Sequence, residues 1–111
     1  METKGLSDKE ILDRVKPLAE HTEKAWNDKN YAEIIRYFID ENPEEHFPEA
    51  EFNRQIEENY DTLGKHTLAD LIAIHRNPDH VIVLWKVQLE KRSEPGLLIY
   101  GFREHQGRIC I

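Results

Sequence analysis

The stretch Val81–Arg103 reads VIVLWKVQLEKRSEPGLLIYGFR, and it holds two apolar runs on either side of the turn-forming segment Lys91–Gly96. Val, Ile, Leu, Trp, Tyr and Phe fill both runs, and such residues favour the pleated, half-buried surface of a sheet. Two such runs, separated by a segment with Pro and Gly, predict neighbouring antiparallel strands. We expect the rest of the chain to be organised around this hairpin.

Two further strands extend the hairpin into a four-stranded meander. Before it, a period of two begins at His66, and Asn77-Pro78-Asp79 supplies turn-forming residues. After it, Gln106-Gly107 is suited to a two-residue hairpin loop, because Gly readily adopts a positive φ. The predicted strands are His66–Arg76, His80–Lys91, Leu97–Glu104 and Arg108–Ile111.

The chain before His66 has the pattern of three helices. Ser7 and Glu10 are spaced as a capping box at the start of the first helix, which ends near Asn27–Asn30. Because Pro17 interrupts its hydrogen bonds, this helix should kink or break near Val15–Lys16. Pro48 opens the third helix, and Gly64 stands at its expected left-handed C-cap. The second helix begins at its cap Asn30 and ends at Asn42-Pro43, and the short loop Glu44–Phe47 follows it. Its apolar stripe consists of Tyr31, Ile34, Ile35, Phe38 and Ile39.

These elements predict one α+β domain over residues 1–111, with three N-terminal helices packed on one face of a curved four-stranded antiparallel sheet. The formal net charge is −7, which repels phosphate backbones and argues against nucleic acid as a partner. One cysteine allows no intrachain disulfide and favours a reducing compartment. Because no apolar run approaches the ~20 residues of a membrane span, we expect a full-length cytoplasmic protein without membrane contact.

Alternation along the strands assigns the two faces of the sheet. The side expected under the helices carries Val83, Trp85, Val87, Leu89, Leu98, Tyr100 and Phe102, joined by Ile109 and Ile111. The other side mixes apolar residues with Lys86, Gln88 and Arg103; the apolar ones are Ile82, Leu84, Leu97, Ile99 and Cys110. A mixed apolar outer face predicts a partner surface, and our first explanation is a homodimer through Ile82, Leu84, Ile99 and Arg103. The alternative is a register slip of one residue, which would exchange the two faces.

The order of these segments resembles the nuclear-transport-factor-2-like (cystatin-like α+β) superfamily, in particular its small bacterial members of unknown function. The resemblance rests on AWNDKNYAEIIRYF, FPEAEFNRQIEENYDTLG and the final LLIYGFREHQGRICI, and it spans about residues 11–111. It implies a cone-like fold that can enclose a pocket, and dimers formed through the sheet. The superfamily includes isomerases, dehydratases, hydrolases and non-catalytic binding domains, so the resemblance selects no activity. The segment 39–50 is too short for the extra strand pair of larger members, which argues against a roomy cavity.

An enzyme of the isomerase type needs a carboxylate base in an apolar pocket and an oxyanion donor. Asp70 is the one acid within the apolar strand LADLIAI, which makes it the candidate catalytic base. The candidate pocket residues are Tyr31, Tyr60 and Tyr100 as donors, with Trp85 and Phe102 as walls. Alternatively, Asp70 faces solvent on an edge strand and the aromatic residues belong to the core.

Other chemistries find less support in the sequence. The six histidines (21, 46, 66, 75, 80 and 105) include no i, i+4 helical pair of the kind that anchors zinc, so we expect no metal and no cofactor. Ser7 and Ser93 occupy a helix cap and a turn, and Cys110 has no activating surroundings beyond Arg103 and Arg108.

We therefore expect a non-catalytic, homodimeric domain that binds a small apolar ligand or a protein partner. An isomerase or dehydratase with Asp70 as base is the alternative, and it requires Asp70 to be buried in a cavity beside Trp85 or Tyr100. A third reading is an accessory or inhibitor-like protein that binds a basic partner through the acidic segment 40–61.

Overall fold

The computed structural model describes residues 2–39 and 42–111. The described elements are α1 (Asp8–Asn27), α2 (Tyr31–Ile34), α3 (Pro43–His46), α4 (Glu49–Leu63), β1 (His66–Arg76), β2 (His80–Leu89), β3 (Gly96–His105) and β4 (Arg108–Cys110). The strands form one antiparallel sheet in the order β1-β2-β3-β4. Asp40 and Glu41, where the predicted second helix ends and the acidic segment 40–61 begins, lie outside the described residues.

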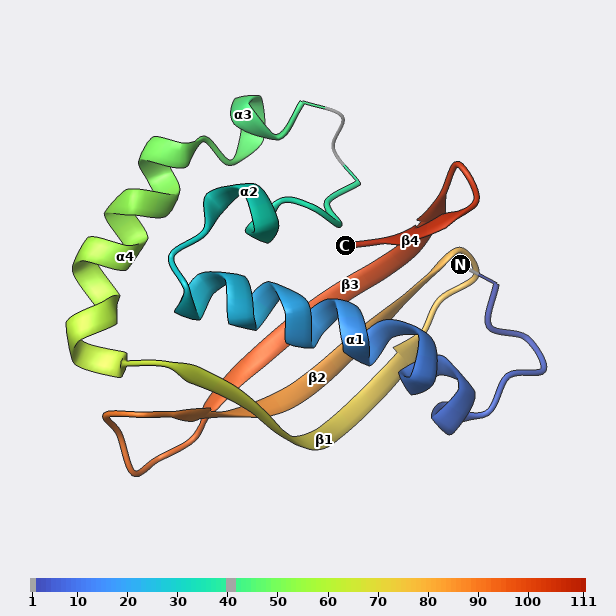
Figure 1. Cartoon of the computed structure of the whole chain (residues 1–111). Coiled ribbons are helices and arrows are strands. Elements are labelled where there is room, and N and C mark those ends of the chain that lie inside the picture. The colour runs from blue at the N-terminus through green and yellow to red at the C-terminus, as the bar shows by residue number, and fades with distance from the viewer. Residues whose placement is uncertain (1, 40–41) are drawn as a thin grey trace.

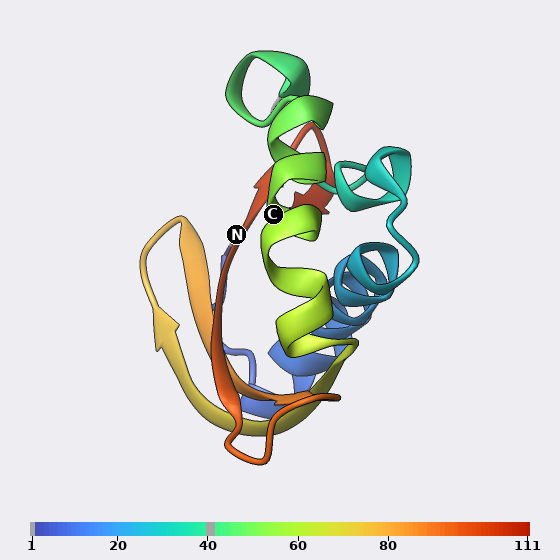
Figure 2. The same ribbon diagram turned by 90° about the vertical axis from the view of Figure 1, so that its left-hand side faces the viewer.

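The predicted α+β class and the four-stranded meander are confirmed. The bounds of β1 agree with the prediction, whereas β2 ends two residues earlier, at Leu89. The Gln106-Gly107 loop also forms as predicted, with φ angles of 52° and 77°, the positive values that a tight hairpin turn requires. The ribbon shows the helices on one side of a bent sheet, and no described element covers the other side (Figures 1 and 2).

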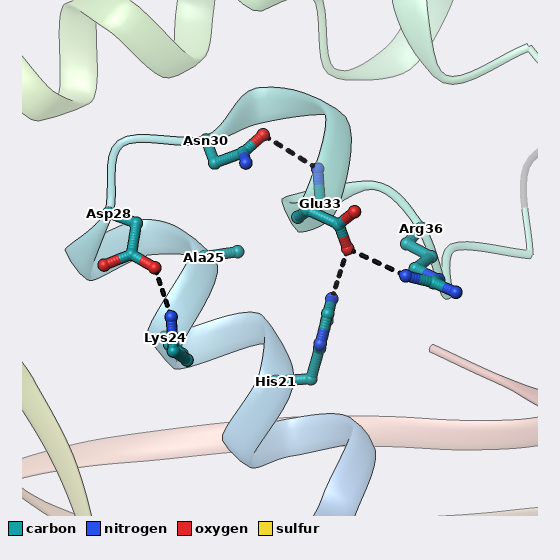
Figure 3. A pocket seen from close by; sticks show the side chains of 7 residues that line it. All are labelled: His21, Lys24, Ala25, Asp28, Asn30, Glu33 and Arg36. Atoms are coloured by element: carbon teal, nitrogen blue, oxygen red, sulfur yellow. Dashed lines mark hydrogen bonds and ion pairs between the residues drawn. The ribbon is translucent and has the colours of Figure 1, made fainter.

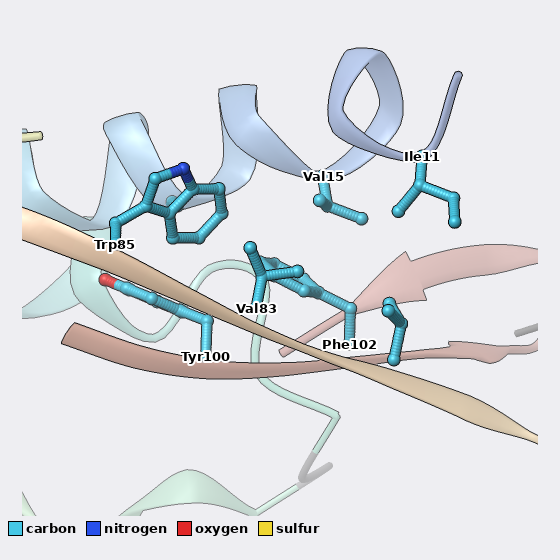
Figure 4. Packing of buried hydrophobic residues seen from close by; sticks show 8 residues of the cluster. Ile11, Val15, Val83, Trp85, Tyr100 and Phe102 are labelled. Atoms are coloured by element: carbon cyan, nitrogen blue, oxygen red, sulfur yellow. The ribbon is translucent and has the colours of Figure 1, made fainter. Parts of the chain in front are cut away.

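Helix α1 lies across the sheet and supplies the helical half of the main core. Its capping box forms as predicted: the Glu10 N–H donates to Ser7 Oγ at 3.1 Å, and the Ser7 N–H donates to Glu10 Oε1 at 3.2 Å. The helix does not break at Pro17: α1 continues through this residue to Asn27. The core cluster, drawn in part in Figure 4, contains Ile11, Val15 and Ala19 from α1 with Val81, Val83, Trp85, Tyr100 and Phe102 from β2 and β3.

The other helices build a second, smaller core. Phe52 of α4 is the residue of that helix that is fully buried, and it packs with Ala25 and Trp26 of α1 and with Ile34 of α2. This cluster contains no residue of the sheet. The prediction of three helices on the sheet therefore needs a correction: four helices are described, and α1 alone contributes buried side chains to the core on the sheet.

The predicted second helix is wrong beyond its first turn. Asn30 caps it, with its Oδ1 accepting from the Glu33 N–H at 3.3 Å, but α2 ends at Ile34. The following segment lies beside the C-terminus: the Ile111 N–H donates to the Tyr37 oxygen at 2.7 Å, and the Ile39 N–H donates to the Ile111 oxygen at 3.0 Å. The Phe38 N–H also donates to the Ile35 oxygen at 3.0 Å, so the chain after α2 turns against the C-terminus and the apolar stripe does not continue as a helix.

Two further local predictions also need correction. The expected loop Glu44–Phe47 contains the single helical turn α3, which has Pro43 at its start, where a missing N–H costs nothing. Gly64 does follow α4, yet its φ of 72° and ψ of −159° lie outside the left-handed helical region. A Cβ there would lie 2.7 Å from Glu90 Cβ, so both the backbone angles and the space require glycine.

Strand β1 is irregular where the sequence pattern is regular. Its register against β2 shifts between Leu68 and Leu71 and again between Leu71 and Ala73. Such bulges bend a strand and change which face a side chain occupies. As a result Leu71 and Ile72 are 40% and 48% exposed, although both are apolar.

Candidate functional site

The five aromatic residues predicted to line a pocket do not meet in one place. Trp85, Tyr100 and Phe102 pack on one another in the main core, with Trp85 and Phe102 each 1% exposed and the Tyr100 and Phe102 rings stacked at 5.7 Å. Tyr31 and Tyr60 pack against the second core instead. Their hydroxyls donate to backbone oxygens, of Phe47 at 2.6 Å and of Asn27 at 2.8 Å, so both are satisfied structural groups.

Asp70, the predicted catalytic base, is exposed on β1. It lies between the two residues where the register first shifts, and it lines an open recess of about 320 Å³ with Lys86 and Gln88 of the outer face. Burial against Trp85 or Tyr100 was the condition for its proposed role. That condition is not met, since a solvated carboxylate lacks the apolar surroundings that activate such a base.

Among the described residues, the buried carboxylate is that of Glu23, which is 8% exposed on α1. It accepts a hydrogen bond from the Tyr100 hydroxyl at 2.5 Å through Oε2, and its Oε1 lies 2.9 Å from His66 Nδ1. Burial, followed by the charge of Glu23, raises the pKa of the Tyr100 hydroxyl well above its usual range. This network joins α1, β1 and β3 at the centre of the fold.

His66 is held on several sides. The Trp26 ring stacks on its imidazole at 3.9 Å, and the Asn27 side chain exchanges hydrogen bonds with its backbone at 2.7 and 2.8 Å. Because a carboxylate only accepts, Nδ1 carries the hydrogen, and Nε2 is left buried without a partner. The adjoining recess of about 170 Å³ is lined by Glu20, Glu23, Lys24, Asn27, His66, Thr67 and Leu68. Since Nε2 is enclosed, no substrate reaches it, and we assign the network a structural role.

A pH titration tests the environment of Tyr100. Its pKa is raised in the folded protein, so its contribution to stability is complete below the ordinary tyrosine pKa of about 10 and is lost as the pH rises above that value. Tyr100→Phe should remove this loss. Above pH 10, roughly, the free energy of unfolding of the variant should therefore fall less steeply with pH than that of the wild type, and the two slopes should differ by up to about 1.4 kcal/mol per pH unit. Urea midpoints measured from neutral to alkaline pH give the two curves, and parallel curves would contradict the buried hydroxyl.

A comparison with Glu23→Gln separates the two causes of the Tyr100 shift. This substitution removes the negative charge beside the hydroxyl but leaves the site buried. Because burial is the larger cause, the alkaline loss should become smaller and yet persist.

A second polar group lies between α1 and α2, where it lines a pocket of about 370 Å³ (Figure 3). Glu33 Oε2 lies 2.8 Å from His21 Nε2 and 3.2 Å from Arg36 Nη1, and the Arg36 contact in particular lowers the pKa of Glu33. Lys24 and Asp28, four residues apart at the end of α1, form an ion pair on one side of the same pocket. Its charges are therefore already matched within the protein.

The predicted dimer residues share the uncovered face of the sheet. Ile99 and its neighbour Leu97 are 65% and 56% exposed, Ile82 and Leu84 are half-buried, and Arg103 is exposed. Cys110 was expected on this face, and its pairing with Arg103 agrees, but the side chain is buried at 3% exposure. The sequence pattern therefore predicted this surface. It did not indicate the buried Glu23, although an acid in phase with the apolar stripe of α1 could have pointed to it.

Within residues 2–39 and 42–111, no group of three His, Cys, Asp or Glu side chains could hold a metal ion. In the same part of the chain, no helix has the length and apolar content needed to cross a membrane. Comparisons of the sequence with protein-family models and with curated proteins find no match.

Proposed function

We propose that this chain is a non-catalytic binding domain that forms a homodimer through the outer face of its sheet. The observation that carries the proposal is a line of apolar side chains across three strands on that face. Ala73 of β1 pairs with Leu84 of β2, and Leu84 pairs with Ile99 of β3. Ile82 and Leu97 extend the line along the strands, and we call these five residues the outer stripe.

The surroundings of the outer stripe favour a second copy as its occupant. Polar residues frame it, with Lys86 and Gln88 towards one end of the strands and Arg103 towards the other, as in an interface with an apolar centre and a polar rim. Exposed Asp70 lies at the Lys86 end. If two copies face each other with their strands antiparallel, the Arg103 end of each sheet meets the end of the other sheet that carries Asp70 and Lys86. A two-fold axis brings both pairs of ends together at once.

The remaining parts of the proposal have indirect support. Membership of the nuclear-transport-factor-2-like superfamily is supported by helices that precede an antiparallel meander. Such membership would imply dimers formed through the sheet. A cytoplasmic location is supported by the single, unpaired Cys110. The enzymatic alternative has no comparable observation, because Asp70 is exposed.

Placing a charge in the outer stripe tests the dimer. Leu84→Lys and Ile99→Lys should each convert a particle of twice 13.2 kDa into a monomer in sedimentation velocity, because a desolvated ammonium is costly at an interface. Both positions face away from the core, so circular dichroism and melting of the monomer should still show a folded domain.

Thr62→Lys is the matched control for these variants. It adds the same charge at an exposed position of α4, outside the outer stripe, and should leave the association unchanged. A wild-type chain that sediments as a monomer would refute the proposal. So would Lys variants that associate as the wild type does.

A further inference from the structure

We infer that the recess between the segment after α2 and strand β4 binds a small carboxylate with a flat apolar body. This recess, the Arg108 recess, has a volume of about 350 Å³ and is lined by Arg36, Tyr37, Arg108, Ile109 and Cys110. The volume lies within the range of small-molecule sites, which is about 300–1,000 Å³. The inference goes beyond the proposed dimer and does not depend on it.

An exposed guanidinium, that of Arg108, borders the recess. Arg108 is exposed, and within the described part of the chain its guanidinium has neither an ion-pair partner nor a side-chain hydrogen bond. Arg14 is likewise without an ion pair among the described residues, but Arg108, unlike Arg14, lines this recess beside a second arginine, Arg36. A guanidinium presents a planar fork of donors that matches a carboxylate in a two-bond arrangement.

Arg36 lines the same recess and has N–H donors that its contact with Glu33 does not use. Its Nη1 donates to Glu33 at 3.2 Å, and a guanidinium has five N–H donors in all. Arg36 therefore stays oriented by Glu33 while it contributes to the field that a ligand meets. Among the described residues, Glu33 offsets the charge of Arg36 and no ion pair offsets that of Arg108, so the described lining of the recess keeps a positive charge.

The recess also has apolar walls. Tyr37, Ile109 and Cys110 give the recess aromatic, aliphatic and thiol surface, and Cys110 is itself buried. Two backbone hydrogen bonds, from Ile111 to Tyr37 and from Ile39 to Ile111, join the two sides at 2.7 and 3.0 Å. Inorganic phosphate would leave these walls unused. A carboxylate attached to a ring uses both the charge and the walls.

Benzoate is the probe, with benzamide as a neutral molecule of the same shape and acetate as a carboxylate without the ring. Benzoate should shift backbone amide resonances of Arg36, Tyr37 and residues 108–110 in two-dimensional NMR. Benzamide and acetate should each bind at least about tenfold more weakly, a factor that corresponds to about 1.4 kcal/mol.

Arg108→Gln should weaken benzoate binding by about tenfold or more, consistent with the loss of a charge-assisted hydrogen-bonded pair. Arg14→Gln is the matched control: it removes the same charge from an exposed position on α1 that has no ion pair, and binding should stay within about twofold. Arg108→Lys keeps the charge without the fork, and its affinity should lie between those of Arg108→Gln and the wild type. The NMR spectrum of each variant reports whether it is folded.

Four results would overturn the inference. The first is the absence of resonance shifts at about 10 mM benzoate, and the second is shifts centred on other residues. The third is an equal loss of benzoate affinity in Arg108→Gln and Arg14→Gln, and the fourth is that benzamide or acetate binds as tightly as benzoate. Leu84→Lys should bind benzoate as the wild type does, since the outer stripe takes no part in the recess. Failure of the dimer and failure of the ligand site can thus be told apart.

Discussion

Trp85→Ala is expected to remove about 3–5 kcal/mol from the free energy of unfolding, which is a large share of the roughly 5–15 kcal/mol typical of a domain. Trp85 is 1% exposed, and its ring meets those of Tyr100 and Phe102 edge-on at 6.0 and 6.3 Å. It lies on the sheet opposite α1, so truncation leaves a cavity between the two layers (Figure 4). Urea denaturation followed by far-UV circular dichroism measures the loss.

Two companion variants keep this prediction open to refutation. Trp85→Phe preserves an aromatic ring and should cost less, so it gives a measurable transition even if Trp85→Ala does not fold. Lys16→Ala shortens an exposed side chain on α1 and should change stability by no more than about 0.5 kcal/mol. A Trp85→Ala midpoint close to that of Lys16→Ala would mean that β2 presents its other face to the helix.

The strands could be predicted because their signals are local. Alternation in His80–Leu89 places Val81, Val83 and Trp85 on one face, and all three are buried there. The turns at 77–79 and 106–107 carry residues whose own conformational preferences end a strand. The bulges of β1 could not be predicted in this way, since LADLIAI reads as a regular strand while its register shifts twice.

The second helix shows where local signals are insufficient. Its cap and apolar spacing at Tyr31 and Ile34 are helical, and one turn does form. The spacing continues to Phe38 and Ile39, but the chain there bonds with Ile111, which is 72 residues away from Ile39. A contact between segments so distant in sequence is invisible to periodicity, and it overrides a weak helical preference.

Local sequence signals were also insufficient to identify the buried polar network. Asp70 attracted attention because it interrupts an apolar strand, yet an edge strand with two bulges leaves it in solvent. Glu23 occupies a position between Thr22 and Trp26 on a helix rich in charge, where one more acid is unremarkable. Only the partners His66 and Tyr100, 43 and 77 residues further along the chain, make its burial possible. A charged residue in phase with an apolar helical stripe is the signal to look for.

Replacing Glu23 should therefore be one of the most damaging polar changes in the chain. Glu23→Ala leaves the Tyr100 hydroxyl and the His66 Nδ1–H without an acceptor, both in the interior. At about 1–3 kcal/mol for each unpaired buried donor, the free energy of unfolding should fall by roughly 2–6 kcal/mol. Urea denaturation at neutral pH gives this value, and Glu23→Gln, which keeps an acceptor oxygen and the side-chain volume, should lose less.

Glu20→Ala is the control that distinguishes the network from a general effect of removing acid from α1. Glu20 lies one turn earlier on the same helix, is exposed, and borders the same small recess. Its loss should change stability by no more than about 0.5 kcal/mol. If the two alanine variants unfold at the same urea concentration, Glu23 does not hold β1 and β3 to the helix. The contacts with His66 and Tyr100 would then have to be absent or compensated in solution.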